Sequence, residues 1–232
     1  MLSSSALPQA VISRSALASS AAAAVAAGGR LADLRRDAWG HGVLSVAHAV
    51  SAAGASAVLV DSEREAEALR LEGISAVVEG LPDIDLQLLY GLPDADGMLR
   101  TTPVMRLAGR VMSTKRLAPG DAVSYGYTHR VTEPTVAALV TGGYAQGIVR
   151  ALGNAAHVEV EGVERPIIGR VAMDVCVVDL QGHEVAVGTE VTYFGGRGPA
   201  APSLTRWSIV TGLSIAELIA VAGAHAERRW EA

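Results

Sequence analysis

Several residue types are scarce in this sequence, and each scarcity excludes a class of protein. The single cysteine, Cys176, excludes an internal disulfide framework and a zinc site built from several cysteines. No run of about 18 apolar residues is uninterrupted, so we expect no membrane-spanning helix. The formal net charge is −5 and no basic block stands out, which argues against nucleic acid as the main partner.

Aromatic residues and lysine are also rare. Aromatics make up 4% of the 232 residues whereas hydrophobic residues make up 50%, so the core must be mainly aliphatic. The mean hydropathy of +0.32 is raised by Ala and Val. Lys115 is the only lysine. No two of the six histidines stand at i, i+4 with an acidic partner, so no metal site is predicted.

The N-terminal segment, residues 1–29, is rich in Ala and Ser and resembles a signal peptide in composition. However, it has no positive charge at its start, and Arg14 interrupts the apolar stretch. We therefore expect a cytoplasmic protein. In this segment we predict a strand over residues 9–12 and a helix over 15–27 that ends at Gly28 and Gly29.

Two regions of the chain differ in their pattern. Residues 9–92 alternate apolar runs with helical stretches, which predicts βαβ units and a parallel sheet. Its further predicted strands are 31–34, 56–60, 74–78 and 85–90, and its further predicted helices are 43–53 and 62–71. From Met105 onward, short apolar runs are separated by Gly- and Pro-containing turns, which predicts an antiparallel β domain. The predicted strands are 108–116, 123–127, 135–140, 157–160, 166–179 and 190–194, followed by a helix over 214–229.

Five short segments follow one another in an informative order. They read Asp37-Ala38-Trp39-Gly40-His41-Gly42, Leu89-Tyr90-Gly91-Leu92, Val123-Ser124-Tyr125-Gly126, Gly143-Tyr144-Ala145-Gln146-Gly147 and Gly169-Arg170-Val171-Ala172-Met173-Asp174. In these residues the sequence resembles the alanine racemase family. The match is nearly continuous over residues 85–213, and over residues 9–80 it covers the start of the family's catalytic domain.

The resemblance implies a fold, a cofactor and a partner. Members of the family join an N-terminal (β/α)₈ barrel to a C-terminal β domain and hold pyridoxal phosphate as a Schiff base on a barrel lysine. They work as head-to-tail dimers that interconvert L- and D-alanine. We therefore expect an α+β fold, with a truncated (β/α) partial TIM-like barrel over residues 1–104 and an antiparallel β-barrel-like C-terminal domain over residues 105–232.

One departure from the family concerns the cofactor amine. The family strand reads Val-Lys-Ala-Asp-Ala-Tyr-Gly-His-Gly, and Arg35 occupies the position of its lysine. A Schiff base needs a neutral primary amine, whereas a guanidinium stays protonated with a pKa above about 12. Lys115 aligns with the β domain, so we do not expect it to replace the lost amine.

A second departure concerns length. A complete TIM barrel takes about 250 residues, but only 104 residues precede Met105. About half of the barrel is missing between Gly80 and Ile84, including most of the loops that usually hold a phosphate. Trp39 also replaces a family tyrosine that touches the cofactor phosphate.

The resemblance assigns roles to individual residues. Tyr125 matches the family's catalytic tyrosine, and it is either a candidate base or a packing residue of the β domain. Arg35 is either an anion ligand in a residual pocket or a charge at a strand end in a solvated or paired position. Trp39 and His41 are candidate cofactor contacts, although His41 also fits a plain strand-to-helix turn. Three further residues match the substrate entrance, with a turn or cap role as the alternative for the last: Tyr144, Met173 and Asp174.

These observations leave two main hypotheses. In the first, the chain is a degenerate racemase relative that lacks Schiff-base chemistry and acts as a binding or partner-interaction module. Because a half barrel exposes strand edges, such a module would form a homodimer or pair with a full-length homologue, and it could bind a small amino acid. In the alternative, the chain is an active pyridoxal-phosphate-dependent alanine racemase that supplies D-alanine for the cell wall. A product without a stable fold is a third possibility.

Overall fold

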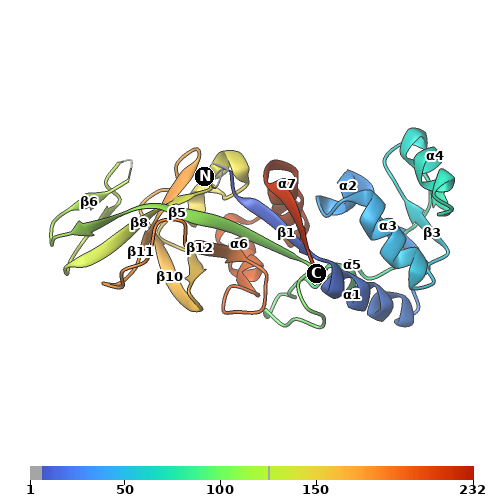
Figure 1. Cartoon of the computed structure of the whole chain (residues 1–232), viewed down its shortest axis with the longest axis horizontal. Coiled ribbons are helices and arrows are strands. Elements are labelled where there is room, and N and C mark those ends of the chain that lie inside the picture. The colour runs from blue at the N-terminus through green and yellow to red at the C-terminus, as the bar shows by residue number, and fades with distance from the viewer. Residues whose placement is uncertain (1–6, 125) are drawn as a thin grey trace.

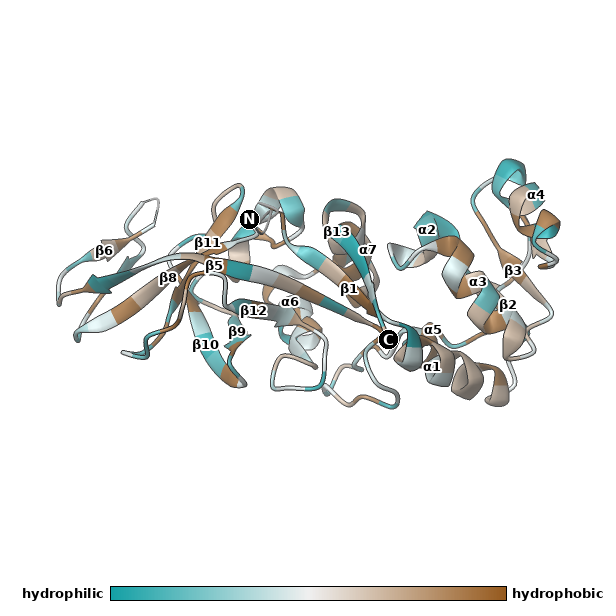
Figure 2. Ribbon diagram, viewed as in Figure 1, coloured by the Kyte–Doolittle hydropathy of each residue, from teal (hydrophilic) through white to brown (hydrophobic). Residues whose placement is uncertain are grey.

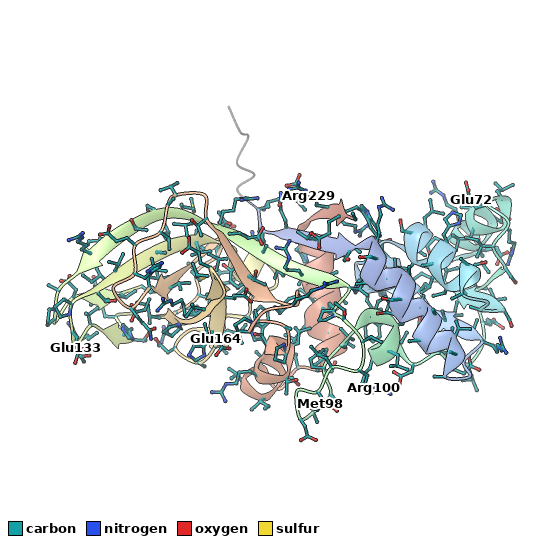
Figure 3. All side chains as sticks on the ribbon, turned by 60° about the horizontal axis from the view of Figure 1, so that its bottom comes forward. Glu72, Met98, Arg100, Glu133, Glu164 and Arg229 are labelled. Carbon is teal, nitrogen blue, oxygen red and sulfur yellow. The ribbon has the colours of Figure 1, made fainter. Side chains whose placement is uncertain are left out.

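The computed structural model describes residues 7–124 and 126–232 and places two regions end to end (Figure 1). One region is built from β-strands, and the other combines helices with a small sheet. Glu133 and Glu72 lie at opposite ends of the molecule (Figure 3). The arrangement confirms the predicted α+β class.

Six antiparallel strands form a closed barrel. Around the ring they are β12 (Glu190–Phe194), β9 (His157–Val160), β10 (Val163–Ile168), β11 (Val175–Asp179), β8 (Thr135–Thr141) and β5 (Met105–Leu117). Closure comes from β12, which pairs with β9 on one side and with β5 on the other. The predicted antiparallel β-barrel-like domain is thus confirmed. The single strand predicted over 166–179 is wrong, because Gly169 turns the chain with φ +71° and separates β10 from β11.

The sheet of the barrel continues into two outer strands. The first strand, β1 (Gln9–Ser13), pairs antiparallel with β5 and parallel with β13 (Glu227–Glu231). The predicted helix over 214–229 is too long, because α7 (Ile215–His225) ends before the chain extends into β13. The strand β13 escapes prediction because its sequence, Glu-Arg-Arg-Trp-Glu, carries charges at four of five positions.

The second region contains a parallel sheet of three strands in the order β2, β3, β4. These strands are β2 (Leu31–Asp33), β3 (Ala57–Leu59) and β4 (Ala76–Val77), and the helices of this region are α1 (Arg14–Ala26), α3 (Val43–Ala52) and α4 (Glu63–Leu71). The predicted alternation of strands and helices agrees with this arrangement. Figure 2 shows hydrophobic residues on β3, whereas β13 is mostly hydrophilic.

The predicted strand over residues 85–90 is wrong, since this segment forms the short helix α5 (Leu86–Tyr90). Asp85 is its N-cap, and its carboxylate accepts the backbone N–H groups of Gln87 and Leu88 at 2.8 and 3.3 Å. Gly91 ends the helix with φ +62°. The capping residues at both ends therefore outweigh the apolar run between them.

One continuous hydrophobic core runs through both regions. Its largest fully buried side chain is Trp207 of α6 (Ser203–Thr211), which meets Phe194 of β12 edge to face with ring centroids 5.4 Å apart.

No helix among the described residues is by itself long and apolar enough to cross a membrane. Helices α6 and α7 together reach such a length and composition but are bent by 106° at their junction.

Candidate functional site

The strand β2 leads into a turn with unusual backbone geometry. The segment α2 (Arg35–Trp39) contains four consecutive residues in the left-handed region, with φ between +53° and +56° from Arg36 to Trp39. Left-handed conformations cost an L-residue about 1–2 kcal/mol each. Backbone strain of this kind persists only where surrounding contacts hold it.

Contacts from two other elements hold the left-handed turn. The carboxylate of Asp37 accepts the N–H of Val43 at the start of α3 at 2.7 Å, and its other oxygen pairs with Arg228 of β13. Arg228 also donates through Nε to the carbonyl of Gly40 at 3.1 Å. The turn is therefore tied to α3 on one side and to β13 on the other.

The guanidinium of Arg35 is paired with a carboxylate of the same chain. Its Nε and Nη2 donate to the two carboxylate oxygens of Asp33 at 2.9 and 2.6 Å, and its backbone N–H donates to the first of these oxygens. The side-chain hydrogen bond that Arg35 donates to Asp33 raises the pKa of Arg35 and lowers the pKa of Asp33. Of the two roles predicted for Arg35, the geometry is that of a paired charge at a strand end.

The sequence offers no amine to replace the missing lysine at this turn. Lys115 lies in β5 opposite Ala137 of β8, near the end of β5 that leads to β6 (Ala122–Val123) (Figure 1). That end lies far from α2, in the barrel region.

Trp39 and His41 both pack against Tyr90 of α5. The ring of His41 stacks on Tyr90 with centroids 4.2 Å apart, and the ring of Trp39 lies 5.6 Å from it. Burial lowers the pKa of His41 to about 4, so its ring is neutral at pH 7. Because Nδ1 faces the carbonyl of Ala38 at 2.9 Å, we place the proton there. Among the described residues, Nε2 of His41 and the hydroxyl of Tyr90 have no hydrogen-bond partner.

Carboxylates follow the ends of two neighbouring parallel strands. Asp33 ends β2 and Asp61 follows β3, and each is paired with an arginine: Asp33 with Arg35, and Asp61 with the side chain of Arg36 at 3.9 Å. The charges at this edge of the sheet are therefore balanced, whereas a phosphate site needs an excess of donors and positive charge. No group of three or more metal-binding side chains gathers among the described residues.

The three predicted substrate residues lie together. The short helix η1 (Tyr144–Gln146) packs on the loop that follows β10, since the N–H of Tyr144 donates to the carbonyl of Ala172 at 3.0 Å. Asp174 accepts a hydrogen bond from the side-chain amide of Gln146 at 2.9 Å. Tyr144 and Met173 are 44% and 55% exposed, so both side chains can contact another molecule.

A cavity of about 400 Å³ adjoins these loops. Its lining includes Ser124 and Gly126, and also Tyr127, Arg170 and Ala172. The predicted catalytic Tyr125 lies outside the described residues. Ser124 donates its hydroxyl to the carbonyl of Arg170 at 2.6 Å, which ties the two loops together.

Helix α7 separates the two groups of predicted site residues within one chain. A Cβ atom on Gly40 would lie 2.5 Å from the Cα of Gly223, so the left-handed turn touches the backbone of α7. A Cβ atom on Gly147, directly after η1, would lie 3.0 Å from the Cα of Ala222. The structure thus brings Arg35, Trp39 and His41 to one side of α7 and brings Tyr144, Met173 and Asp174 to the other.

Sequence reasoning misses several residues that shape this site, namely Asp33, Asp61, Tyr90 and Arg228. The pair of Asp33 and Arg35 has a usable signal, because opposite charges only two residues apart in the sequence can reach each other. The contacts of Arg228 have no such signal, since they join segments at opposite ends of the sequence.

Comparisons with known proteins converge on one family. The family model described as "Alanine racemase, C-terminal domain" matches residues 104–230. An alanine racemase from Frankia casuarinae is 35% identical over 181 residues, which are 77% of this chain and 44% of that protein. One from Desulfovibrio desulfuricans is 38% identical over 133 residues, which are 53% of this chain and 36% of that protein. The chain therefore spans less than half the length of these relatives.

Solved structures agree on the fold. The alanine racemase from Streptomyces coelicolor A3(2) superposes with a TM-score of 0.80 at 21% identity, covering 98% of both chains. The alanine racemase from the D-cycloserine-producing Streptomyces lavendulae superposes with a TM-score of 0.83 at 18% identity, covering 97% of both chains. At these identities the likeness concerns the fold alone.

Proposed function

The chain belongs to the alanine racemase family, and we propose that it is a member without Schiff-base chemistry that acts as a binding or partner-interaction module. The observation that carries this proposal is the double hydrogen bond between Arg35 and Asp33 at the position of the family's lysine. Pyridoxal phosphate is the family's cofactor, and when bound it stabilises negative charge at the substrate α-carbon.

The residues of this chain do not fit that cofactor. An aldehyde condenses with a neutral amine, whereas the guanidinium of Arg35 is held protonated by the carboxylate of Asp33. Asp61 is likewise paired with Arg36, so this edge of the sheet offers no excess positive charge to a phosphate. We therefore derive no catalytic step through pyridoxal phosphate.

The exposed loops at the barrel support a binding role. Tyr144 and Met173 combine apolar surface with exposure, and the neighbouring cavity of about 400 Å³ could hold a small amino acid. As partners of these loops we propose a second copy of the chain or a full-length racemase. The expected cytoplasmic location stays a prediction.

The test compares the wild type with Arg35→Lys after addition of pyridoxal phosphate and reduction with borohydride. Peptide mapping by mass spectrometry should find no cofactor on the segment around position 35 in the wild type. Arg36→Lys is the matched control, because it places a lysine on the next residue, whose side chain is 83% exposed. Cofactor trapped at position 35 but not at position 36 would indicate that the pocket survives and that only the amine is lost.

Two results would contradict the proposal. One is pyridoxal phosphate attached covalently to the wild-type chain as purified. The other is formation of D-alanine from L-alanine by the wild type, alone or mixed with a full-length racemase, that disappears in Tyr125→Phe. The second result would favour the alternative of an active racemase.

A further inference from the structure

The parallel sheet has two outer edges, one on β2 and one on β4, because β3 lies between them. An unpaired edge is a template on which another strand can add. In β4, the carbonyls of Ser75 and Val77 accept the N–H groups of Val58 and Val60 of the β3 segment. Successive residues of a strand face opposite sides in the plane of the sheet, so the N–H and carbonyl of Ala76 face the outer edge.

Arg70 of α4 occupies this outer edge. Its Nε and Nη2 both donate to the carbonyl of Ala76, at 3.1 and 2.7 Å. Its remaining nitrogen, Nη1, donates to Glu63 in the first turn of the same helix. The planar guanidinium therefore bridges helix and strand with all of its nitrogens engaged. An incoming strand could use the Ala76 carbonyl only after Arg70 had left it.

Asp83 occupies the other edge, on β2. Its Oδ1 accepts the backbone N–H groups of Arg30 and Leu31, both at 2.7 Å. The carbonyl of Leu31 in turn accepts the N–H groups of Asp83 and Ile84 at 3.1 and 3.2 Å. These backbone hydrogen bonds lower the pKa of Asp83. The segment that follows β4 thus returns across the region and covers the edge of β2.

We infer that the three-stranded sheet is complete within this chain and that Arg70 prevents a second copy from adding a strand to β4. Exposed hydrophobic side chains on the segments before and after β4 favour association with a second copy, since Leu71 and Leu81 are 90% and 91% exposed and Val78 is 40% exposed. With Arg70 in place, a partner has to use another surface, such as the loops around Tyr144. At the half-barrel edges for which the sequence suggests a partner, Arg70 occupies the outward carbonyl of β4 and Asp83 occupies the N–H groups of Arg30 and Leu31.

The experiment removes Arg70 and follows the mass of the folded chain by light scattering over a range of concentrations. Arg70→Ala should roughly double the mass relative to the wild type at the highest concentration, because it frees the Ala76 carbonyl. Arg64→Ala is the matched control: it removes the same charge from the exposed face of α4, where Arg64 has no hydrogen bond or ion pair among the described residues. It should leave the mass unchanged.

A second substitution tests whether the association uses β4. Ala76→Pro removes the outward N–H of the edge and adds a ring at a buried position, so in an Arg70→Ala background that still folds it should restore the wild-type mass. If Arg70→Ala is too unstable to compare, hydrogen exchange of the wild type decides. The Ala76 amide should exchange fast at every concentration, whereas the inward Val77 amide should be protected. An unchanged mass in folded Arg70→Ala, or concentration-dependent protection of the Ala76 amide in the wild type, would overturn the inference.

Discussion

The two larger sheets among the described residues end in different ways. The barrel closes on itself through backbone pairing, because β12 bonds to β9 and to β5. The parallel sheet does not close, and its edges instead meet the side chains of Arg70 and Asp83. Backbone closure leaves the six strands of the barrel without a free edge, whereas side-chain closure depends on single residues. The parallel sheet is therefore the part of the fold that one substitution can open.

The two regions also differ in how they satisfy buried polar groups. In the barrel, the buried Tyr193 hydroxyl donates to the carbonyl of Thr141 at 2.8 Å and lies 3.2 Å from the sulfur of Cys176. Among the described residues, Trp207 Nε1 beside the barrel is buried without a partner, and so are Ser20 Oγ, His41 Nε2 and the Tyr90 hydroxyl in the other region. Two of these atoms, on the stacked rings of His41 and Tyr90, lie next to the left-handed turn, which carries a conformational cost of its own.

The largest expected effect tests whether the two regions unfold as one. Trp207→Ala should lower the free energy of unfolding by about 3–5 kcal/mol, because Trp207 is fully buried. Since the core is continuous, amides of α3 should lose protection together with those of the barrel. Urea unfolding combined with hydrogen exchange measures both. Trp230→Ala on the outer strand β13 is the control and should cost less, because Trp230 is only partly buried. If the α3 amides of Trp207→Ala exchange hydrogen at the same rate as in the wild type, the two regions unfold independently.

The next largest effect is a dependence of stability on pH that arises from His41 in the N-terminal region. His41 has a pKa near 4 in the folded chain against 6.5 ordinarily, so between these values the unfolded chain binds a proton that the folded chain does not. Stability should therefore fall as pH falls through this window, by about 2 kcal/mol at about pH 5. Urea unfolding at neutral and acidic pH checks this.

Two asparagine variants sharpen the pH test. His41→Asn keeps a donor near the carbonyl of Ala38 but cannot titrate, so this part of the pH dependence should disappear. His48→Asn is the control and should retain the pH dependence caused by His41, because it changes a different side chain that is 52% exposed. Equal pH dependence in the wild type and His41→Asn would show that other groups cause the loss.

The smallest effect concerns the segment that joins the regions. Asp85→Ala removes the N-cap of α5 and should lower stability by about 1 kcal/mol. Asp85→Asn keeps a capping oxygen while removing the ion pair with Arg100, so it should retain most of the stability. Thermal unfolding of the three proteins makes the comparison. An equal loss in both variants would assign the effect to the ion pair.

The sequence predicts local features of this fold better than long-range ones. The strands β2 and β3 and the helices α1, α3 and α4 follow from apolar periodicity and glycine stops, and the barrel strands follow from their turns. In contrast, the pairing of β12 with β5 that closes the barrel joins segments far apart in the chain, and no local pattern encodes it.

The candidate site shows the same division. The replacement of lysine by Arg35 is visible in one residue, and its chemical meaning follows from the guanidinium alone. Its neutralisation by Asp33 is also local. The packing of Trp39 and His41 on Tyr90 depends on α5, which the sequence reasoning assigns to a strand, so it could not be predicted. The role of Tyr125 stays a prediction.

The position of α7 couples two loops that share no direct contact. Its backbone lies against Gly40 on one side and against Gly147 on the other, with no side chain between to absorb a displacement. A molecule that displaces η1 would therefore press on the same helix backbone that the left-handed turn touches. The exposed surface around Tyr144 and the turn that contains His41 thus share one helix as their common support.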